Sequence, residues 1–343
     1  MKINIFTDPH LNVSRQAHTT PTSSHALNQR LFDAAMATKS AELANYCAGD
    51  LFDKAFNPEW AVIQGIKVAE NCYVLSGNHD ETNREGTKCS LEVVKAAGVG
   101  KIYRTPSVSD VFWNKTADGV YMIPHHASQE LFVRALREAA ADSQGIGTAM
   151  VHCNRGEIMG DTPDSILVIS KELEDELLKS FKRIFYGHEH GSHSNKVEGD
   201  VVTSNAVVLG NTPPTSFSDV SDKYRYEYCT ETDVLKRIMI WSKDAKFLQL
   251  ELGQPFPEGA NPDVIEVTGK GSRIEVVEYM DALWSAYPAT LMIRPNVTYT
   301  GATEVMEVTQ ADTVNLADAI AKDLDGEVKE LFIKLLGNVS HGN

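Results

Sequence analysis

Short apolar runs alternate with amphipathic segments over the first two thirds of the chain. The apolar runs predict buried strands at 2–7, 71–76, 120–124, 147–153, 183–187, 201–205 and 206–210. Apolar residues at helical spacing predict helices at 25–43, 87–99, 128–141 and 169–181. Strands that alternate with helices imply crossover connections, so this part of the chain is expected to form a layered α/β domain.

The pattern changes after residue 215. Residues 224–252 are rich in β-branched and aromatic residues, which is typical of closing strands of the same domain. The stretch QPFPEGANP holds three prolines and marks a boundary. Beyond it, strands at 264–269 and 289–295 enclose a helix at 273–287. We therefore predict a first domain over 1–252 and a smaller α+β cap domain over 253–305.

The final segment, 306–343, predicts a C-terminal helix. Its apolar residues recur three or four apart, at Leu316, Ile320, Leu324, Val328, Leu331 and Leu335, and Gly337 stands where a C-cap is expected. Two roles are open for the apolar face of this helix. It either packs on its own protein or docks on a partner.

Length and composition are those of a folded protein. A chain of 343 residues suggests two domains, and 42% hydrophobic with 23% charged residues is ordinary for a globular protein. The N-terminus lacks the apolar core of a secretory signal, and no window reaches the ~18 apolar residues of a membrane span. The five cysteines form no C-x-x-C pair, so we expect reduced thiols, a cytoplasmic location and no membrane association.

The net charge is −15. This charge disfavours sequence-independent binding of nucleic acid, because such binding comes from Lys and Arg residues that neutralise phosphates. Bound divalent cations would weaken the objection, since they invert the local electrostatics of a site and can meet phosphate directly.

Acidic, amide and histidine side chains follow the ends of predicted strands, and Asp50 and Asp53 follow Gly49 in the stretch ELANYCAGDLFD. In chain order they are Asp8 and His10, then Asp50 and Asp53, then Asn78, His79 and Asp80, then His152, and finally His188 and His190. Taken alone, each group has an ordinary structural explanation, either as a turn or, for a single histidine, as a residue of the core. Ligands of α/β sheets bind beyond the carboxyl ends of the strands, so the five groups together are expected to converge on one site.

The donor types point to divalent cations. Carboxylate, imidazole and amide oxygen without thiolate suit Mn²⁺, Fe²⁺ or Zn²⁺ and favour none sharply. The candidate ligands exceed one coordination sphere, and a carboxylate such as Asp50 can bridge, so two ions are more plausible than one. Two adjacent ions suit an in-line phosphoryl displacement. His79, beside Asn78, would then be free to protonate the leaving alkoxide.

The motifs D-x-H, G-D-x-x-D, G-N-H-D, a lone strand-end His and G-H-x-H, in this order, resemble the calcineurin-like metallophosphoesterase superfamily over roughly residues 1–215. The resemblance implies a layered β-sandwich flanked by helices. It assigns the first ion to Asp8, His10, Asp50 and His190, and the second to Asp50, Asn78, His152 and His188. It also makes His79 the catalytic histidine.

The form of the second metal motif, together with features outside the metal motifs, resembles the SbcD-type subunits that process DNA double-strand ends, including their phage recombination-endonuclease relatives. These features are GDLFD, the stretch after GHEH, the cap domain and the terminal helix. The resemblance implies a Mn²⁺-dependent DNA nuclease, an exonuclease on duplex ends and an endonuclease on single strands. It further implies a homodimer, and an SbcC-like SMC-type ATPase partner that the terminal helix docks on.

Two positions in these motifs need separate comment. Asp53 stands where many nuclease relatives have histidine, and we count it as a candidate catalytic residue whose role differs from theirs. Asp80 is a candidate for orienting His79, although a turn residue explains it equally well.

Two alternatives to a nuclease are open. The first is a phosphatase, or a nucleotide or cyclic-nucleotide phosphodiesterase, on the same scaffold. Phosphoprotein phosphatases of the superfamily carry arginines within their second motif and soon after GNHE, whereas this chain has Lys54 and GNHDETNR. The missing arginines favour diester over monoester chemistry. The second alternative is a metal-binding scaffold without catalysis, which the presence of every ligand and of His79 disfavours.

Overall fold

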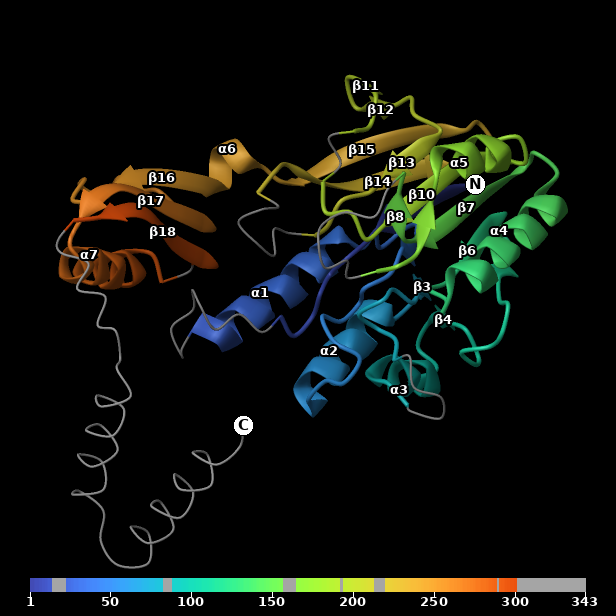
Figure 1. Cartoon of the computed structure of the whole chain (residues 1–343), viewed down its shortest axis with the longest axis horizontal. Coiled ribbons are helices and arrows are strands. Elements are labelled where there is room, and N and C mark those ends of the chain that lie inside the picture. Colours follow the sequence, from blue (N-terminus) through green and yellow to red (C-terminus); the bar gives the residue numbers. More distant parts are fainter. Residues whose placement is uncertain are drawn as a thin grey trace, which may run out of the picture.

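The first and larger part of the chain is a sandwich of two β-sheets with helices on both outer faces (Figure 1). The computed structural model describes residues 1–13, 23–82, 88–156, 165–191, 194–212, 220–288 and 290–300. The predicted terminal helix at 306–343 lies outside the described residues.

The larger sheet has eight strands in the order β11-β12-β15-β14-β1-β2-β3-β4. Its parallel half consists of β1 (Lys2–Phe6), β2 (Ala44–Cys47), β3 (Cys72–Leu75) and β4 (Lys101–Tyr103). Its antiparallel half consists of β14 (Lys223–Cys229), β15 (Val234–Trp241), β12 (Val201–Val202) and β11 (Val197–Glu198). Of the strands predicted within 224–252, only those up to Trp241 therefore belong to this sheet.

The second sheet has five strands in the order β13-β10-β7-β6-β5. They are β13 (Ala206–Val208), β10 (Phe181–Gly187), β7 (Gly147–His152), β6 (Val120–Ile123) and β5 (Asn114–Lys115), of which only β5 is antiparallel to its neighbour. A short pair, β8 (Asn154–Arg155) and β9 (Val168–Ile169), follows the end of β7. The carboxyl ends of β6, β7 and β10 thus share one edge.

Three apolar layers hold the sandwich together. Ile5, Tyr46, Met150 and Phe185 belong to the core between the sheets. On the outer face of the larger sheet lie α1 (Ser23–Thr38), α2 (Glu59–Ala69) and α3 (Ser90–Ala97). On the outer face of the smaller sheet lie α4 (Gln129–Ser143) and α5 (Lys171–Leu177). The predicted α/β sandwich flanked by helices is confirmed, and no described helix is long and apolar enough to cross a membrane.

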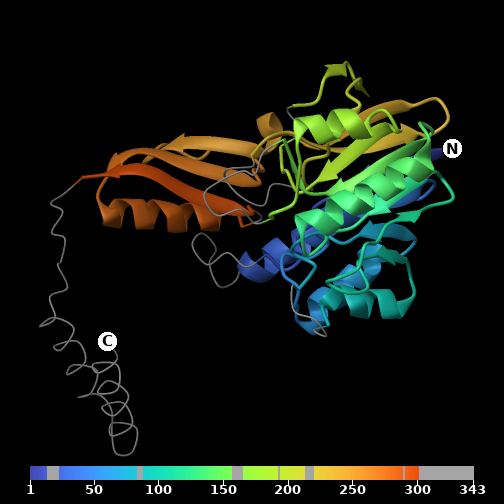
Figure 2. The same ribbon diagram turned by 45° about the vertical axis from the view of Figure 1, so that its right-hand side comes forward.

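A small three-stranded unit follows the sandwich and lies to one side of it (Figure 2). It contains β16 (Phe247–Glu251), β17 (Val264–Gly271), α7 (Arg273–Ala286) and β18 (Met292–Tyr299), and the short α6 (Lys243–Lys246) leads into it. A capping box between Ser272 and Glu275 starts α7. The sequence prediction placed 247–252 in the first domain, but β16 pairs in parallel with β17, which puts this strand in the small sheet.

The sequence pattern missed β2 and α2. The strand β2 has the sequence ANYC, in which the buried Asn45 interrupts the apolar run that β3 and β6 show. In α2, the buried face carries Ala61 and Gly65 rather than large apolar residues. Gly65 is required there because a Cβ would lie 2.3 Å from the Phe52 ring. A helix that packs through small residues gives a weak amphipathic signal.

Asp263, at the start of β17, joins the small unit to the sandwich. Its carboxylate accepts hydrogen bonds from Trp241 Nε1 at 2.9 Å and from the guanidinium of Arg30 in α1. Leu31, Trp241 and Val264 belong to one apolar cluster that surrounds this contact. The small unit is thus attached through a buried charged centre enclosed by apolar side chains.

We predict that Asp263→Ala lowers the free energy of unfolding by about 2 to 4 kcal/mol, because it removes the acceptor of the buried indole N–H and the ion pair with Arg30. Urea unfolding followed by circular dichroism measures the change. Asp244→Ala, an exposed position in α6, is the matched control and should unfold like the parent protein. Equal stability of both variants would show that Asp263 does not hold the two parts together.

Candidate metal centre

The loops that follow β1 and β2 run side by side and carry the first ligand candidates. Asp8 N–H donates to Gly49 C=O at 3.1 Å, and His10 N–H donates to Asp50 C=O at 3.1 Å. The φ angles of Asp8, His10 and Asp50 are 53°, 45° and 47°, in the left-handed region that non-glycine residues rarely adopt. Such strain is typical of residues whose side chains are placed for a function.

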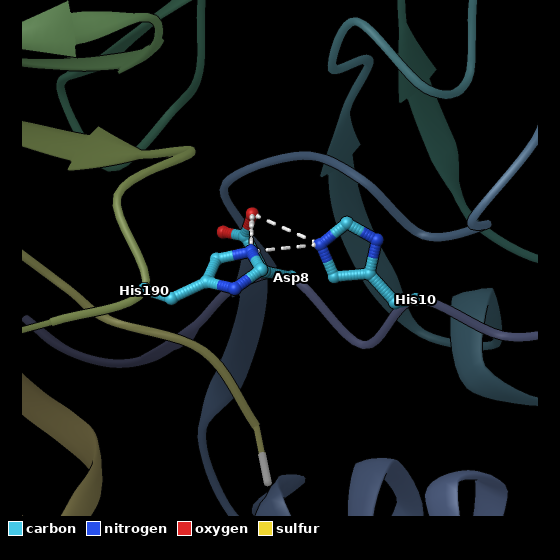
Figure 3. A group of neighbouring side chains, drawn as sticks. All are labelled: Asp8, His10 and His190. Atoms are coloured by element: carbon cyan, nitrogen blue, oxygen red, sulfur yellow. Dashed lines mark hydrogen bonds and ion pairs between the residues drawn. The ribbon is translucent and has the colours of Figure 1, made fainter. Parts of the chain in front are cut away.

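Asp8, His10 and His190 form one cluster, with their polar atoms directed at a common point (Figure 3). The Nε2 atoms of the two histidines lie 3.0 Å apart. Asp8 Oδ1 lies 3.6 Å from His10 Nε2 and 3.7 Å from His190 Nε2. The predicted ligands of the first ion therefore meet.

Asp50, His152 and His188 form a second cluster. His152 Nε2 lies 3.1 Å from Asp50 Oδ2 and 3.1 Å from Asn78 Oδ1. His152 Nδ1 donates to Ala48 C=O at 2.9 Å, which leaves the lone pair of Nε2 free for an ion. Asp50 Oδ2 also lies 3.8 Å from His10 Nε2, so this one oxygen stands between the two clusters.

The hydrogen bonds of Asp8 indicate whether the clustered residues fit metal ions. Its Oδ2 accepts hydrogen bonds from the Thr7 hydroxyl and from His188 N–H. Its Oδ1 is buried and has no hydrogen-bond partner among the described residues. A buried carboxylate oxygen without a donor is costly unless a cation meets it. The orphaned oxygen faces two imidazole nitrogens, so the donor set fits a divalent cation.

The charges of the cluster also favour a cation. Burial opposes protonation of His152, but the charges of Asp50 and Asp8 outweigh it and raise its pKa to about 9. His188 differs, because burial and the neighbouring His152 lower its pKa to about 4. Protons on histidines such as His152 balance the charge of the neighbouring carboxylates when no metal is bound. A metal ion that binds to these groups displaces the protons.

His79 lies beside the first cluster and is held in place by two hydrogen bonds. Its Nδ1 lies 2.9 Å from Asp53 C=O, and its backbone N–H donates to Asp50 Oδ1 at 3.0 Å. Its ring meets the His10 ring edge-on, with centroids 5.1 Å apart. The hydrogen bond to a carbonyl requires the proton on Nδ1, so Nε2 is left to exchange a proton with a substrate.

The calcineurin-like phosphoesterase family model matches residues 1–192 of the 343-residue chain. The chain belongs to this family. No curated protein matches it. Members of the family use two divalent metal ions, and the clusters above supply the ligands for them. The protein is therefore a metal-dependent phosphoester hydrolase.

Two motif glycines let this phosphoesterase bring its ligand loops together. A Cβ on Gly77 would lie 2.1 Å from Asp50 Oδ1, and one on Gly187 would lie 2.4 Å from Ala48 C=O. Both contacts are closer than real Cβ atoms approach. The glycines before Asn78 and His188 are thus required by packing against the loop of Asp50.

Asp80 does not contact the His79 ring, in contrast to the sequence interpretation that it orients this histidine. Its carboxylate is fully buried and accepts from the backbone N–H groups of Leu51, Phe52 and Gly77 at 3.0 to 3.1 Å. Burial and the charge of Asp50 raise the pKa of Asp80 to about 7, against the effect of these donors. Asp80 fastens the GNHD loop to the GDLFD loop.

Sequence reasoning missed two residues that hold the GHEH loop of the phosphoesterase. Lys223 Nζ donates to His190 C=O at 2.9 Å, although the lysine is buried. Glu189 Oε1 accepts from Arg155 N–H at 2.7 Å and ties this loop to the end of β7. Glu189 stands between the two ligand histidines, which was a usable signal, whereas Lys223 gave none because its acceptor is a main-chain carbonyl.

We predict that Asp80→Ala destabilises the protein by about 3 kcal/mol or more, because buried N–H groups lose their charged acceptor. His79→Ala, at the neighbouring position, is the control and should cost only about 1 kcal/mol, since it removes a single hydrogen bond. Urea unfolding of both variants measures the difference. A small effect of Asp80→Ala would contradict its structural role.

Proposed function

We propose that this phosphoesterase is a two-metal DNA nuclease that hydrolyses phosphodiesters, acting as an exonuclease on duplex ends and as an endonuclease on single strands. Mn²⁺ is the proposed metal, with Fe²⁺ or Zn²⁺ as alternatives, because the donors are oxygen and imidazole nitrogen without thiolate. The observation that carries the proposal is the small unit joined to the catalytic sandwich by Asp263.

Two arginines that touch the metal loops in the described part of the chain support a diester substrate. Arg104 makes two hydrogen bonds to Glu81, next to the GNHD motif, and a further one to Glu92. Arg155 makes two hydrogen bonds to Glu174. Both guanidinium groups are therefore neutralised by carboxylates. A phosphate monoester carries more negative charge than a diester and is usually held by bidentate arginine, so these pairings favour the diester.

His79 has the position of a general acid. Bound metal ions would supply positive charge to the phosphate and align it for in-line attack. Hydrolysis breaks the bond from phosphorus to the leaving oxygen while a bond to the attacking water oxygen forms and the water loses a proton. His79 Nε2 then gives a proton to the leaving alkoxide, and the Asp53 carbonyl keeps the ring oriented.

The small unit supports a polymeric substrate. It adds a second folded surface, β16 to β18 with α7, to a catalytic sandwich that already contains the complete ligand set. A small phosphate ester requires no such extension, whereas a nucleic acid extends beyond the scissile phosphate. The phosphatase and cyclic-nucleotide phosphodiesterase alternatives leave this unit without a role.

The proposal predicts Mn²⁺-dependent shortening of end-labelled linear duplex DNA that chelator abolishes. His79→Ala should lower kcat on DNA by about 10² to 10⁴-fold, the usual contribution of a general acid. The same variant should lose far less activity on bis(p-nitrophenyl) phosphate, whose leaving group needs no proton. Gel electrophoresis and absorbance measure the two reactions.

A nucleotide monoester and a cyclic nucleotide are assayed in parallel. Intact DNA beside metal-dependent turnover of either compound would refute the nuclease and favour the alternative. Equal DNA cleavage by the parent protein and His79→Ala would refute the role of His79.

We also propose a homodimer formed through exposed apolar side chains in α2 and just before it. Phe56 precedes the helix, Trp60 and Ile63 lie in it, and the three side chains are 59%, 38% and 53% exposed. Grouped exposed apolar side chains mark an interaction surface more often than scattered ones do.

We predict that the parent protein has twice the 37.8 kDa mass of one chain in light scattering after gel filtration. Ile63→Glu should yield monomers, because it places a charge in the contact. Ile146→Glu, at a 69% exposed position between α4 and β7, is the control and should leave the dimer intact. A monomeric parent protein would refute this contact.

The ATPase partner stays a prediction. We propose that the segment 306–343 docks on an SbcC-like SMC-type ATPase and that the complex acts in the cytoplasm on DNA ends. Among the described residues the five cysteines are unpaired, and four of them are buried, which agrees with a reducing compartment.

A further inference from the structure

Asp53 lies between a metal ligand and the proposed general acid. Its backbone N–H donates to Leu11 C=O at 2.9 Å, and a β-bridge joins Leu11 to Phe52. The loop that carries Asp53 is therefore fixed against the loop that carries His10. The side chain of Asp53 is 24% exposed, so it faces the site rather than the apolar core.

Two different atoms of Asp53 meet the two histidines. Its side-chain Oδ1 lies 3.5 Å from His10 Nδ1. Its main-chain carbonyl lies 2.9 Å from His79 Nδ1. His10 Nδ1 is buried and has no closer polar partner in the described part of the chain. The closest contact of the carboxylate is thus with His10, although it also lies within 4.8 Å of a His79 ring nitrogen, and the main-chain carbonyl accepts the hydrogen bond from His79 Nδ1.

The position of the carboxylate determines which nitrogen of His10 carries the proton. A carboxylate facing Nδ1 favours the tautomer with hydrogen on that atom. The lone pair is then on Nε2, the atom that meets Asp8 and His190. A carboxylate that supports a ligand histidine in this way also raises its basicity, and removal of such a partner typically costs 10- to 100-fold in metal affinity.

We propose that the Asp53 side chain is a positioning residue for the first metal ion, acting through His10, and that it does not orient His79. This replaces the sequence interpretation of Asp53 as a catalytic residue. The inference rests on the metal-dependent hydrolysis proposed above but not on DNA as the substrate. Its main consequence is that side-chain substitution at Asp53 separates metal affinity from proton transfer.

Titration of the metal-free protein with Mn²⁺ in a calorimeter tests the proposal without catalysis. Asp53→Ala should weaken one of the two sites by about 10- to 100-fold and leave the other unchanged. Asp53→Asn keeps the shape and an acceptor oxygen, so its affinity should lie between Asp53→Ala and the parent. Asp175→Asn removes the same charge at an exposed position of α5 and is the matched control.

Kinetics give a second readout that a purely structural role would not produce. Raising Mn²⁺ should restore kcat of Asp53→Ala close to that of the parent, whereas it should not restore His79→Ala. The restoration of Asp53→Ala by Mn²⁺ is measured on bis(p-nitrophenyl) phosphate as well as on DNA, so a protein that does not cut DNA still tests the proposal. The comparison with His79→Ala is made on DNA, because the leaving group of the small ester needs no proton. Parent-like Mn²⁺ binding by Asp53→Ala, or a loss of kcat that saturating Mn²⁺ does not restore, would overturn it.

Discussion

The carboxylate of Asp50 is the contact on which the whole site depends. Its Oδ1 accepts the His79 N–H, and its Oδ2 stands between His10 and His152, so it links both metal clusters and the loop that carries His79, the proposed general acid. The surrounding residues hold this side chain in position. Gly77 leaves room for Oδ1, and Asp80 fixes the residues that follow Asp50 by accepting their N–H groups. Displacing Asp50 would therefore change both metal sites and the position of His79 together.

This arrangement is strained and relies on the sandwich for support. Asp8, His10, Asp50 and His188 all have positive φ angles, and each such residue costs on the order of 1 to 3 kcal/mol. Parallel strands of both sheets end next to these residues and share a core of buried side chains, which holds the strained loops in place. The ligands can therefore be preorganised before any ion binds.

The sequence predicted most of the candidate ligands because they follow strands whose apolar runs are easy to recognise, whereas Asp50 follows β2, which the pattern missed, and was found from the GDLFD stretch. His152 had no motif of its own, and its position at the end of the run at 147–153 was sufficient. The remaining features depend on main-chain atoms or on long-range pairing, which residue types do not reveal. Asp80 binds backbone N–H groups, His79 is held by a backbone carbonyl, and β16 joins the small sheet by pairing with a strand beyond the proline-rich segment.

The acidic composition becomes consistent with phosphate chemistry when the ion pairs of the arginines near the site are considered. A chain with a net charge of −15 has little general attraction for a polyanion. Arg104 and Arg155, which touch the metal loops, are bonded to glutamates. Among the described residues the arginines beside the metal loops are thus paired with carboxylates, and metal ions held by Asp8 and Asp50 would supply positive charge to the site. Binding of the phosphoester is then coupled to metal occupancy, because the empty cluster presents Asp8 and Asp50 to an anion and would repel it.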